Sequence, residues 1–138
     1  MRGSFLPAAL VAFIATTGAA TAQDAVDLKG SWVGRTEAVA IGTPVHSDTP
    51  HPDPRQPGLS ERNVTLTITG QDGRRFWGTF GSSGGSEPII GVFSTPDSFM
   101  FVDREGYTNG TVRGDTIEWM YGRSGDTMVA ARVVLTRQ

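Results

Sequence analysis

The chain has 138 residues, a formal net charge of −2 at pH 7 and no cysteine. The slight acidic balance argues against a nucleic-acid-binding protein, which needs a basic face, and against attachment to anionic membrane surfaces. Without cysteine there is no disulfide, so stability must come from a closed sheet, from close packing or from the association of copies.

Residues 1–22 have the pattern of a secretory signal peptide. Arg2 gives a positively charged N-terminal region, residues 6–15 form the apolar segment, and the Ala-Thr-Ala of residues 20–22 is a small-residue cleavage site. The run is too short to span a bilayer, which takes about 20 residues; a retained anchor helix is the alternative. We therefore expect a periplasmic or secreted protein, no membrane insertion, and a single mature domain of residues 23–138.

After the cleavage site, hydrophobic residues recur with a period of two, which is typical of half-buried β-strands. Turn dipeptides such as Asp72-Gly73 and Pro96-Asp97 separate the alternating runs. The expected strands cover residues 28–41, 64–69, 75–82, 87–95, 99–104, 107–113, 116–123 and 128–137.

Consecutive strands joined by short turns predict an all-β fold, a single eight-stranded antiparallel up-and-down barrel. Closure removes the exposed edges that an open sheet of this size would carry. Glycines inside the strands allow the bends that closure requires. A two-sheet β-sandwich is the alternative.

Residues 43–60 interrupt the alternation, because they contain five prolines and both histidines of the chain. Proline lacks the backbone donor that a central strand needs, so a long loop is expected between the first two strands. His46, Asp48, His51 and Asp53 form a doubled H-x-D pattern whose side chains could ligate zinc or copper. The spacing matches no established metal motif, so a solvated polar loop is the favoured interpretation, and neither a metal nor a cofactor is expected.

Gly30-Ser31-Trp32 opens the first expected strand, and a G-x-W at this place in an eight-stranded barrel resembles the calycins. In calycins the tryptophan closes one end of the barrel, and a basic residue of the last strand packs against it. The resemblance therefore implies a pair between Trp32 and Arg137, with Arg132 as the second choice. The alternative is that Trp32 is an ordinary core residue.

The middle of the chain resembles the avidin branch of the calycins, through the stretch LTITGQDGRRFWGTFGS of residues 66–82. The polar pocket of avidins is not retained. Gly34 and Ala38 occupy the positions of two polar pocket residues on the first strand of avidins, and Phe80 occupies the position of the pocket tyrosine. Ser82 matches a serine of the avidin pattern. Each lost hydrogen bond costs about 1–3 kcal/mol, so the resemblance does not imply tight biotin binding.

The expected function is that of an exported, non-enzymatic binding module whose barrel takes a small, largely apolar ligand. Aromatic side chains that share one parity should face the interior, together with a serine as a polar contact. These candidates are Phe80, Ser82, Phe93, Phe101, Trp119 and Tyr121. The alternative is that they fill a solid core, since eight strands leave little room inside. No enzymatic activity is expected, because the chain has no G-x-S-x-G motif and no carboxylate pair can be nominated.

Apolar side chains of the opposite parity should lie side by side on the outside of three consecutive strands. They are Trp77, Ile90, Val92, Met100 and Val102. A soluble monomer seldom exposes such a patch, so a two-fold homodimer through this face is expected. The alternative function is a protein-interaction module, such as an enzyme inhibitor or an envelope assembly factor, that uses the barrel surface and the proline-rich loop.

Cleavage before Gln23 is the testable consequence of the signal-peptide pattern. N-terminal sequencing of protein from the periplasmic fraction should find chains that begin at Gln23, with that residue free or cyclised. Soluble periplasmic protein that still begins at Met1 would contradict the expected cleavage.

Overall fold

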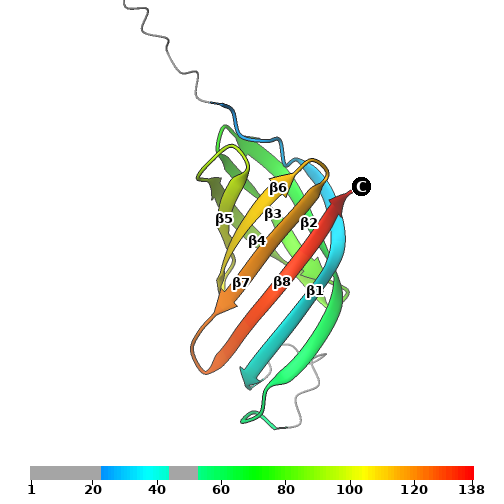
Figure 1. The fold of residues 1–138 in the computed structure, drawn as a ribbon, viewed down its shortest axis with the longest axis vertical. Coiled ribbons are helices and arrows are strands. Elements are labelled where there is room, and N and C mark those ends of the chain that lie inside the picture. Colours follow the sequence, from blue (N-terminus) through cyan, green and yellow to red (C-terminus); the bar gives the residue numbers. More distant parts are fainter. Residues whose placement is uncertain (1–22, 44–52) are drawn as a thin grey trace, which may run out of the picture.

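The computed structural model describes residues 23–43 and 53–138, which form a closed barrel of eight antiparallel strands (Figure 1). Each strand pairs with its neighbours in sequence, and β1 also pairs with β8 to close the sheet. The strands are β1 (Gly30–Gly42), β2 (Gly58–Asp72), β3 (Arg75–Ser82), β4 (Gly85–Phe93), β5 (Ser98–Val102), β6 (Tyr107–Arg113), β7 (Thr116–Arg123) and β8 (Thr127–Arg137). The predicted up-and-down barrel is confirmed, and the two-sheet sandwich is not formed.

The expected signal peptide, residues 1–22, lies outside the described part of the chain. Within the part that is described, no helix is long and apolar enough to cross a membrane.

The main difference from the predicted strands lies at the start of β2. This strand begins at Gly58, so the last three residues of the loop expected over residues 43–60 belong to β2 instead. The early part of β2 points Ser60 and Arg62 to the inside of the barrel and Leu59 to the outside. Because polar residues take the inner positions there, the alternation of this stretch is not hydrophobic and was not recognised as a strand.

One half of the barrel interior, here called the packed half, is filled by large side chains. It surrounds the end at which β1 begins and β8 ends. The almost fully buried residues of its inner wall include Trp32, Leu66, Ile68, Phe76, Phe93, Phe99, Phe101, Ile117, Trp119 and Leu135. Their rings meet edge to face, with centroids 5.5 Å apart for Phe76 and Phe93 and 5.1 Å apart for Phe101 and Trp119. Burial of each ring contributes about 1.5–3 kcal/mol to stability.

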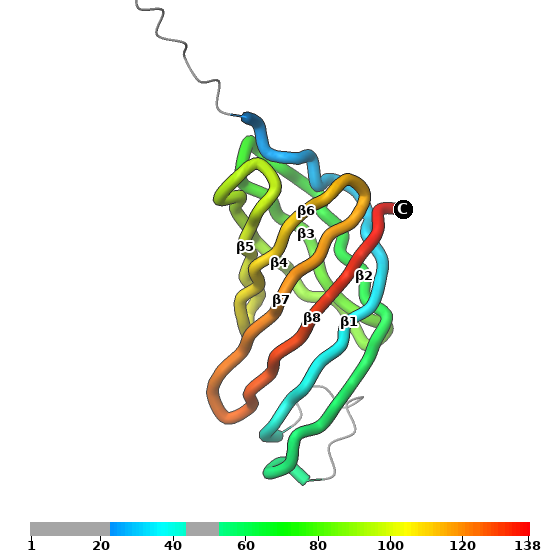
Figure 2. Tube along the Cα trace, in the orientation of Figure 1, coloured from blue at the N-terminus to red at the C-terminus, as the bar shows by residue number. Residues whose placement is uncertain are grey.

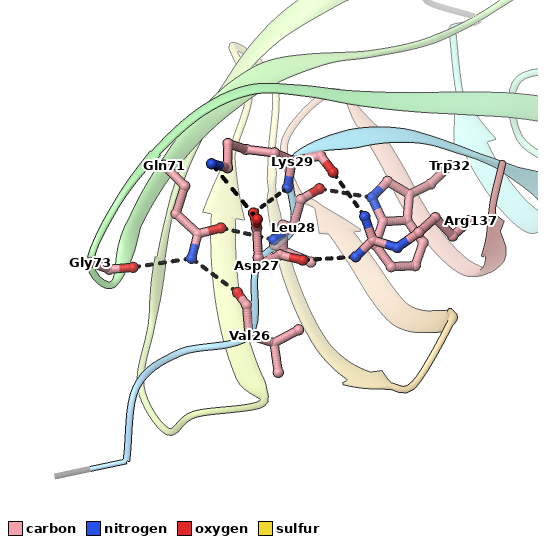
Figure 3. Close-up of polar contacts among 8 residues, drawn as sticks. All are labelled: Val26, Asp27, Leu28, Lys29, Trp32, Gln71, Gly73 and Arg137. Atoms are coloured by element: carbon pink, nitrogen blue, oxygen red, sulfur yellow. Dashed lines mark hydrogen bonds and ion pairs between the residues drawn. The ribbon is translucent and has the colours of Figure 1, made fainter. Parts of the chain in front are cut away.

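Residues 23–29, here called the N-terminal strap, cross the packed end of the barrel (Figure 2). The strap inserts Leu28, which is fully buried, into the hydrophobic core. The side chain of Gln71 holds the strap by its backbone, as Figure 3 shows. Its amide oxygen accepts the Leu28 N–H at 2.8 Å, and its amide nitrogen donates to the Val26 carbonyl at 2.9 Å. These two bonds satisfy backbone groups that neither strand ladder reaches.

Arg137 holds the strap from the other side and also covers Trp32 (Figure 3). Its guanidinium donates to the carbonyl oxygens of Asp27 at 2.7 Å and Lys29 at 2.8 Å. The guanidinium carbon lies 4.1 Å from the centroid of the Trp32 ring, within the range of a cation–π contact. The indole N–H of Trp32 in turn donates to the Leu28 carbonyl at 2.9 Å. The structure thus brings together the two residues that the calycin resemblance pairs.

The second choice for that pair, Arg132, lies elsewhere. It projects from the outer face of β8 and donates to the Glu118 carboxylate of β7 at 2.7 Å. Glu118 is exposed and alternates along β7 with the buried Ile117 and Trp119. Arg132 therefore takes no part in closing the barrel end.

Trp32→Ala is expected to lower the free energy of unfolding by about 3–5 kcal/mol, because it removes a fully buried ring. Arg137→Ala should cost less. Since the two side chains touch and hold the same strap, the double variant should lose less stability than the sum of the single variants. Urea unfolding of the wild type and the three variants measures this coupling.

Arg132→Ala is the matched control for this cycle, because it removes an arginine of the same strand that does not reach Trp32. Its effect should add to that of Trp32→Ala. Additive effects of Trp32→Ala and Arg137→Ala would contradict the coupling of the pair.

Candidate functional site

At the end of the barrel opposite the strap, side chains that face inward stay partly exposed to solvent. We call this end the open half. Successive side chains of a strand point to opposite faces, so a residue that lies an even number of positions from a buried inward-facing residue of the same strand also faces inward. Its partly exposed members are Thr36, Ala38, Ser60, Phe80, Ser82, Glu87 and Tyr121. Their exposure indicates that solvent reaches the inner wall here, in contrast to the packed half.

The structure divides the six predicted ligand residues between the two halves. Phe80, Ser82 and Tyr121 line the open half. The ring of Phe80 lies at the border, because its centroid is 5.2 Å from that of the buried Trp119 ring. The candidates of the packed half are Phe93, Phe101 and Trp119. A ligand in the open half would therefore meet the first three side chains directly and the other three only through the rings that cover them.

Thr108 is a residue of the inner wall that the sequence analysis missed. It is fully buried on β6 and lies between its cross-strand neighbours, Phe101 of β5 and Tyr121 of β7. Among the described residues, its hydroxyl is the one buried side-chain polar atom without a hydrogen-bond partner. Leaving a buried hydroxyl unpaired costs about 1–3 kcal/mol. The alternation of Thr108 with the buried Val112 could have placed it on the inner wall, but not shown that it is unpaired.

The pKa of the Tyr121 phenol reflects the burial and the charged groups of the open half. Burial raises the pKa of its phenol to about 12, and the carboxylates of Asp103, Glu105 and Glu87 act in the same direction, while Arg123 opposes them. The phenol is therefore neutral at physiological pH. Three carboxylates and one guanidinium thus converge on this ring from β4, β7 and the turn between β5 and β6.

Two of these three carboxylates have partners within the barrel. Asp103 accepts the backbone N–H groups of Glu105 at 2.8 Å and Gly106 at 2.7 Å, and so stabilises the turn after β5. Glu105 accepts a hydrogen bond from Arg123 at 2.9 Å, in a partly buried ion pair. The Glu87 carboxylate forms neither a hydrogen bond nor an ion pair with any residue that the structure describes. It is therefore the one carboxylate of the three without a partner among the described residues.

Of the four residues considered as metal ligands, His46, Asp48 and His51 lie outside the described residues. The carboxylate of Asp53 accepts hydrogen bonds from the backbone N–H of Arg55 at 2.9 Å and from its guanidinium at 3.1 Å. Over residues 23–43 and 53–138, no three histidine, aspartate or glutamate side chains gather in a way that could hold a metal ion.

A second surface lies on the outside of β3, β4 and β5, where an apolar groove has a volume of about 590 Å³. We call it the outer groove. Its lining includes all five residues predicted for the outer face: Trp77, Ile90, Val92, Met100 and Val102. Ile90 is 65% exposed and Trp77 is 46% exposed. The indole of Trp77 lies across Gly70, at which a Cβ atom would come within 2.3 Å of the ring, so the glycine provides its seat.

Comparison with known proteins finds no family model, no curated protein and no solved structure that matches this chain. The resemblance to calycins therefore rests on the residues of this sequence. The inner wall has a steric constraint at Gly34, where a Cβ atom would lie 1.9 Å from the carbonyl oxygen of Val134. No side chain fits at this position of the inner wall.

Thr108→Val is expected to raise the free energy of unfolding by about 1 kcal/mol, because it replaces an unpaired buried hydroxyl by a methyl group of similar size. Urea unfolding measures the change. Thr65→Val, at an exposed position on the outer face of β2, is the matched control and should have a smaller effect. Loss of stability in Thr108→Val would show that the hydroxyl has a partner in solution.

Proposed function

We propose that this protein is an exported, non-enzymatic binding module whose barrel takes a small, largely apolar ligand into its open half. The observation that carries the proposal is the partial exposure of Phe80, Ser82 and Tyr121, which face the inside of a barrel whose other half is densely packed. Protein interiors are normally filled to crystal-like density. Inward-facing rings in contact with solvent are therefore the feature that needs explaining.

The side chains of the open half have the composition of a small-molecule site. Such sites combine aromatic and apolar walls with a few polar groups that orient the ligand. Phe80 and Tyr121 supply rings, Ala38 leaves space, and the hydroxyls of Thr36 and Ser82 supply polar contacts. This mixture fits a ligand that is mostly apolar and carries a small polar group.

The proposal also states that the protein is exported and that it binds its ligand without catalysing a reaction. The signal-peptide pattern of residues 1–22 supports a periplasmic or secreted location. Both histidines of the chain belong to the proline-rich stretch, and the sequence has no nucleophile motif, which supports binding rather than catalysis.

The proposal includes an evolutionary relationship between this protein and the calycins. The G-x-W that opens β1 and the packing of the Arg137 guanidinium over the Trp32 ring support it. In this arrangement the strap and the pair close one end of the barrel, and the opposite end serves as the entrance.

Titration with N-phenyl-1-naphthylamine, an uncharged apolar fluorophore, is expected to give a saturable rise in fluorescence at one site per chain. Ala38→Phe should abolish the rise, because a ring on the inner wall fills the open half. Val39→Phe places the same ring on the outer face one residue away and should leave binding unchanged. Equal binding by the two variants would place the fluorophore outside the barrel interior.

A protein-interaction role through the outer groove is the second candidate function. The observation that favours it is the groove itself, since apolar residues of three adjacent strands stay exposed around Trp77. Contiguous apolar patches of this kind usually mark an interface. A two-fold homodimer, in which each copy presents the same groove, is the simplest such assembly.

Light scattering of the purified mature protein is expected to give the mass of a dimer that Trp77→Glu converts to a monomer. A charge buried in an apolar interface without a partner is strongly unfavourable. Ala130→Glu, at an exposed position of β8 on the opposite side of the closed barrel, is the control and should leave the dimer intact. A monomeric wild type at high concentration would refute the interface, and a dimer that persists in Trp77→Glu would refute its location.

A further inference from the structure

Glu87 is a half-buried carboxylate that faces the inside of the open half. It alternates on β4 with the buried Ile89 and lies directly opposite Phe80 of β3. Its charge acts on the phenol of Tyr121, which belongs to β7. A carboxylate that is partly withdrawn from water favours a hydrogen-bonded or oppositely charged neighbour, and the described residues provide none.

The remaining charges of the open half do not neutralise Glu87. The two other carboxylates near Tyr121 are already engaged, one by backbone N–H groups and one by Arg123. Arg62, the other guanidinium on this part of the inner wall, has an interaction partner of its own. Glu87, Asp103 and Glu105 set against Arg123 and Arg62 leave the described residues of this end with one more negative than positive charge, which attracts a cation and repels an anion.

The aromatic rings beside Glu87 favour the same kind of ligand. The faces of Phe80 and Tyr121 carry the negative part of the ring quadrupole and attract an ammonium group. Both rings are partly exposed, although they pack against the core. A ligand with an apolar body and a cationic end would contact the rings and the carboxylate together.

The Thr108 hydroxyl is an independent indication of a missing partner. It is fully shielded from solvent, faces inward beside Tyr121, and has no hydrogen-bond partner within residues 23–43 and 53–138. An ammonium group has three donors and no acceptor, so it needs several oxygen acceptors. A hydroxyl oxygen and a carboxylate on one inner wall supply two of them.

We propose that the open half binds a small organic cation, namely an ammonium group carried on an aromatic or other apolar body. The ammonium donates to the Glu87 carboxylate and to the Thr108 hydroxyl, and the body lies against Phe80 and Tyr121. Because Thr108 is covered, the ligand displaces the half-exposed side chain of Tyr121 as it enters. This inference rests on the proposed function and names the ligand class of the same site.

Calorimetric titration with three probes of similar shape tests the charge preference. The probes are 2-phenylethylamine, 2-phenylethanol and 3-phenylpropionate, which carry an ammonium, a hydroxyl and a carboxylate group on the same ring. The wild-type protein is expected to bind the amine about tenfold more tightly than the alcohol, because the ammonium group adds a charge-assisted hydrogen bond to Glu87. It should bind the acid more weakly than either, because the two carboxylates repel each other.

Glu87→Gln should lower the affinity for the amine about tenfold and leave the affinity for the alcohol unchanged. The unchanged alcohol binding also shows that the variant is folded. Glu37→Gln removes one negative charge from an exposed position on the outer face of β1 and is the matched control. It should bind all three probes like the wild type. Thr108→Val should weaken amine binding severalfold.

The outcomes separate this inference from the proposed function. Equal affinity for the amine and the alcohol, or an amine affinity that Glu87→Gln does not change, overturns the cation site but leaves the binding module standing. A similar loss in Glu37→Gln also overturns it, because the preference is then a general effect of net charge. Failure to bind any of the three probes or N-phenyl-1-naphthylamine overturns both proposals.

Discussion

The pairing of β1 with β8 is the constraint on which the rest of the structure depends. These strands are the two ends of the sheet, and their antiparallel register, which sets Trp32 opposite Arg137, leaves no strand edge exposed. The same register brings the Arg137 guanidinium over the indole and onto the carbonyl groups of the strap. Closure of the sheet and closure of the barrel end therefore depend on the same strand register.

The two halves of the interior follow from the sizes of the inner-wall side chains. In the packed half the rings are so large that a neighbouring strand carries glycine, and a Cβ atom at Gly91 would lie 2.2 Å from the Phe76 ring. In the open half the wall also includes small or polar side chains, as at Ala38 and Ser60, and its inward-facing residues stay partly exposed. The packed half supplies the stability with which the barrel tolerates an unpaired Thr108 hydroxyl.

The alternation of the strands gives the protein two separate surfaces. The residues that fill the core and those that line the outer groove are neighbours in sequence, as Phe76 and Trp77 illustrate, yet they lie on opposite sides of the sheet. The lack of a side chain at Gly70 leaves room for the Trp77 indole, because a Cβ atom there would lie 2.3 Å from the ring. A ligand inside the barrel and a partner outside it can therefore bind through residues of the same strands without competing for them.

The sequence by itself predicted most of the strands, the faces to which their side chains point, and a barrel with a sandwich as the alternative, because alternation and turn dipeptides are local properties of the chain. It also indicated which side chains face inward at Phe80 and Tyr121 and outward at Trp77. Only the tertiary structure decided that β2 starts at Gly58 and that Glu87 and Thr108 lack partners in the part of the chain that the structure describes. Whether a polar side chain is paired depends on the strands across the barrel, and closure of the sheet sets those neighbours through contacts between residues far apart in sequence.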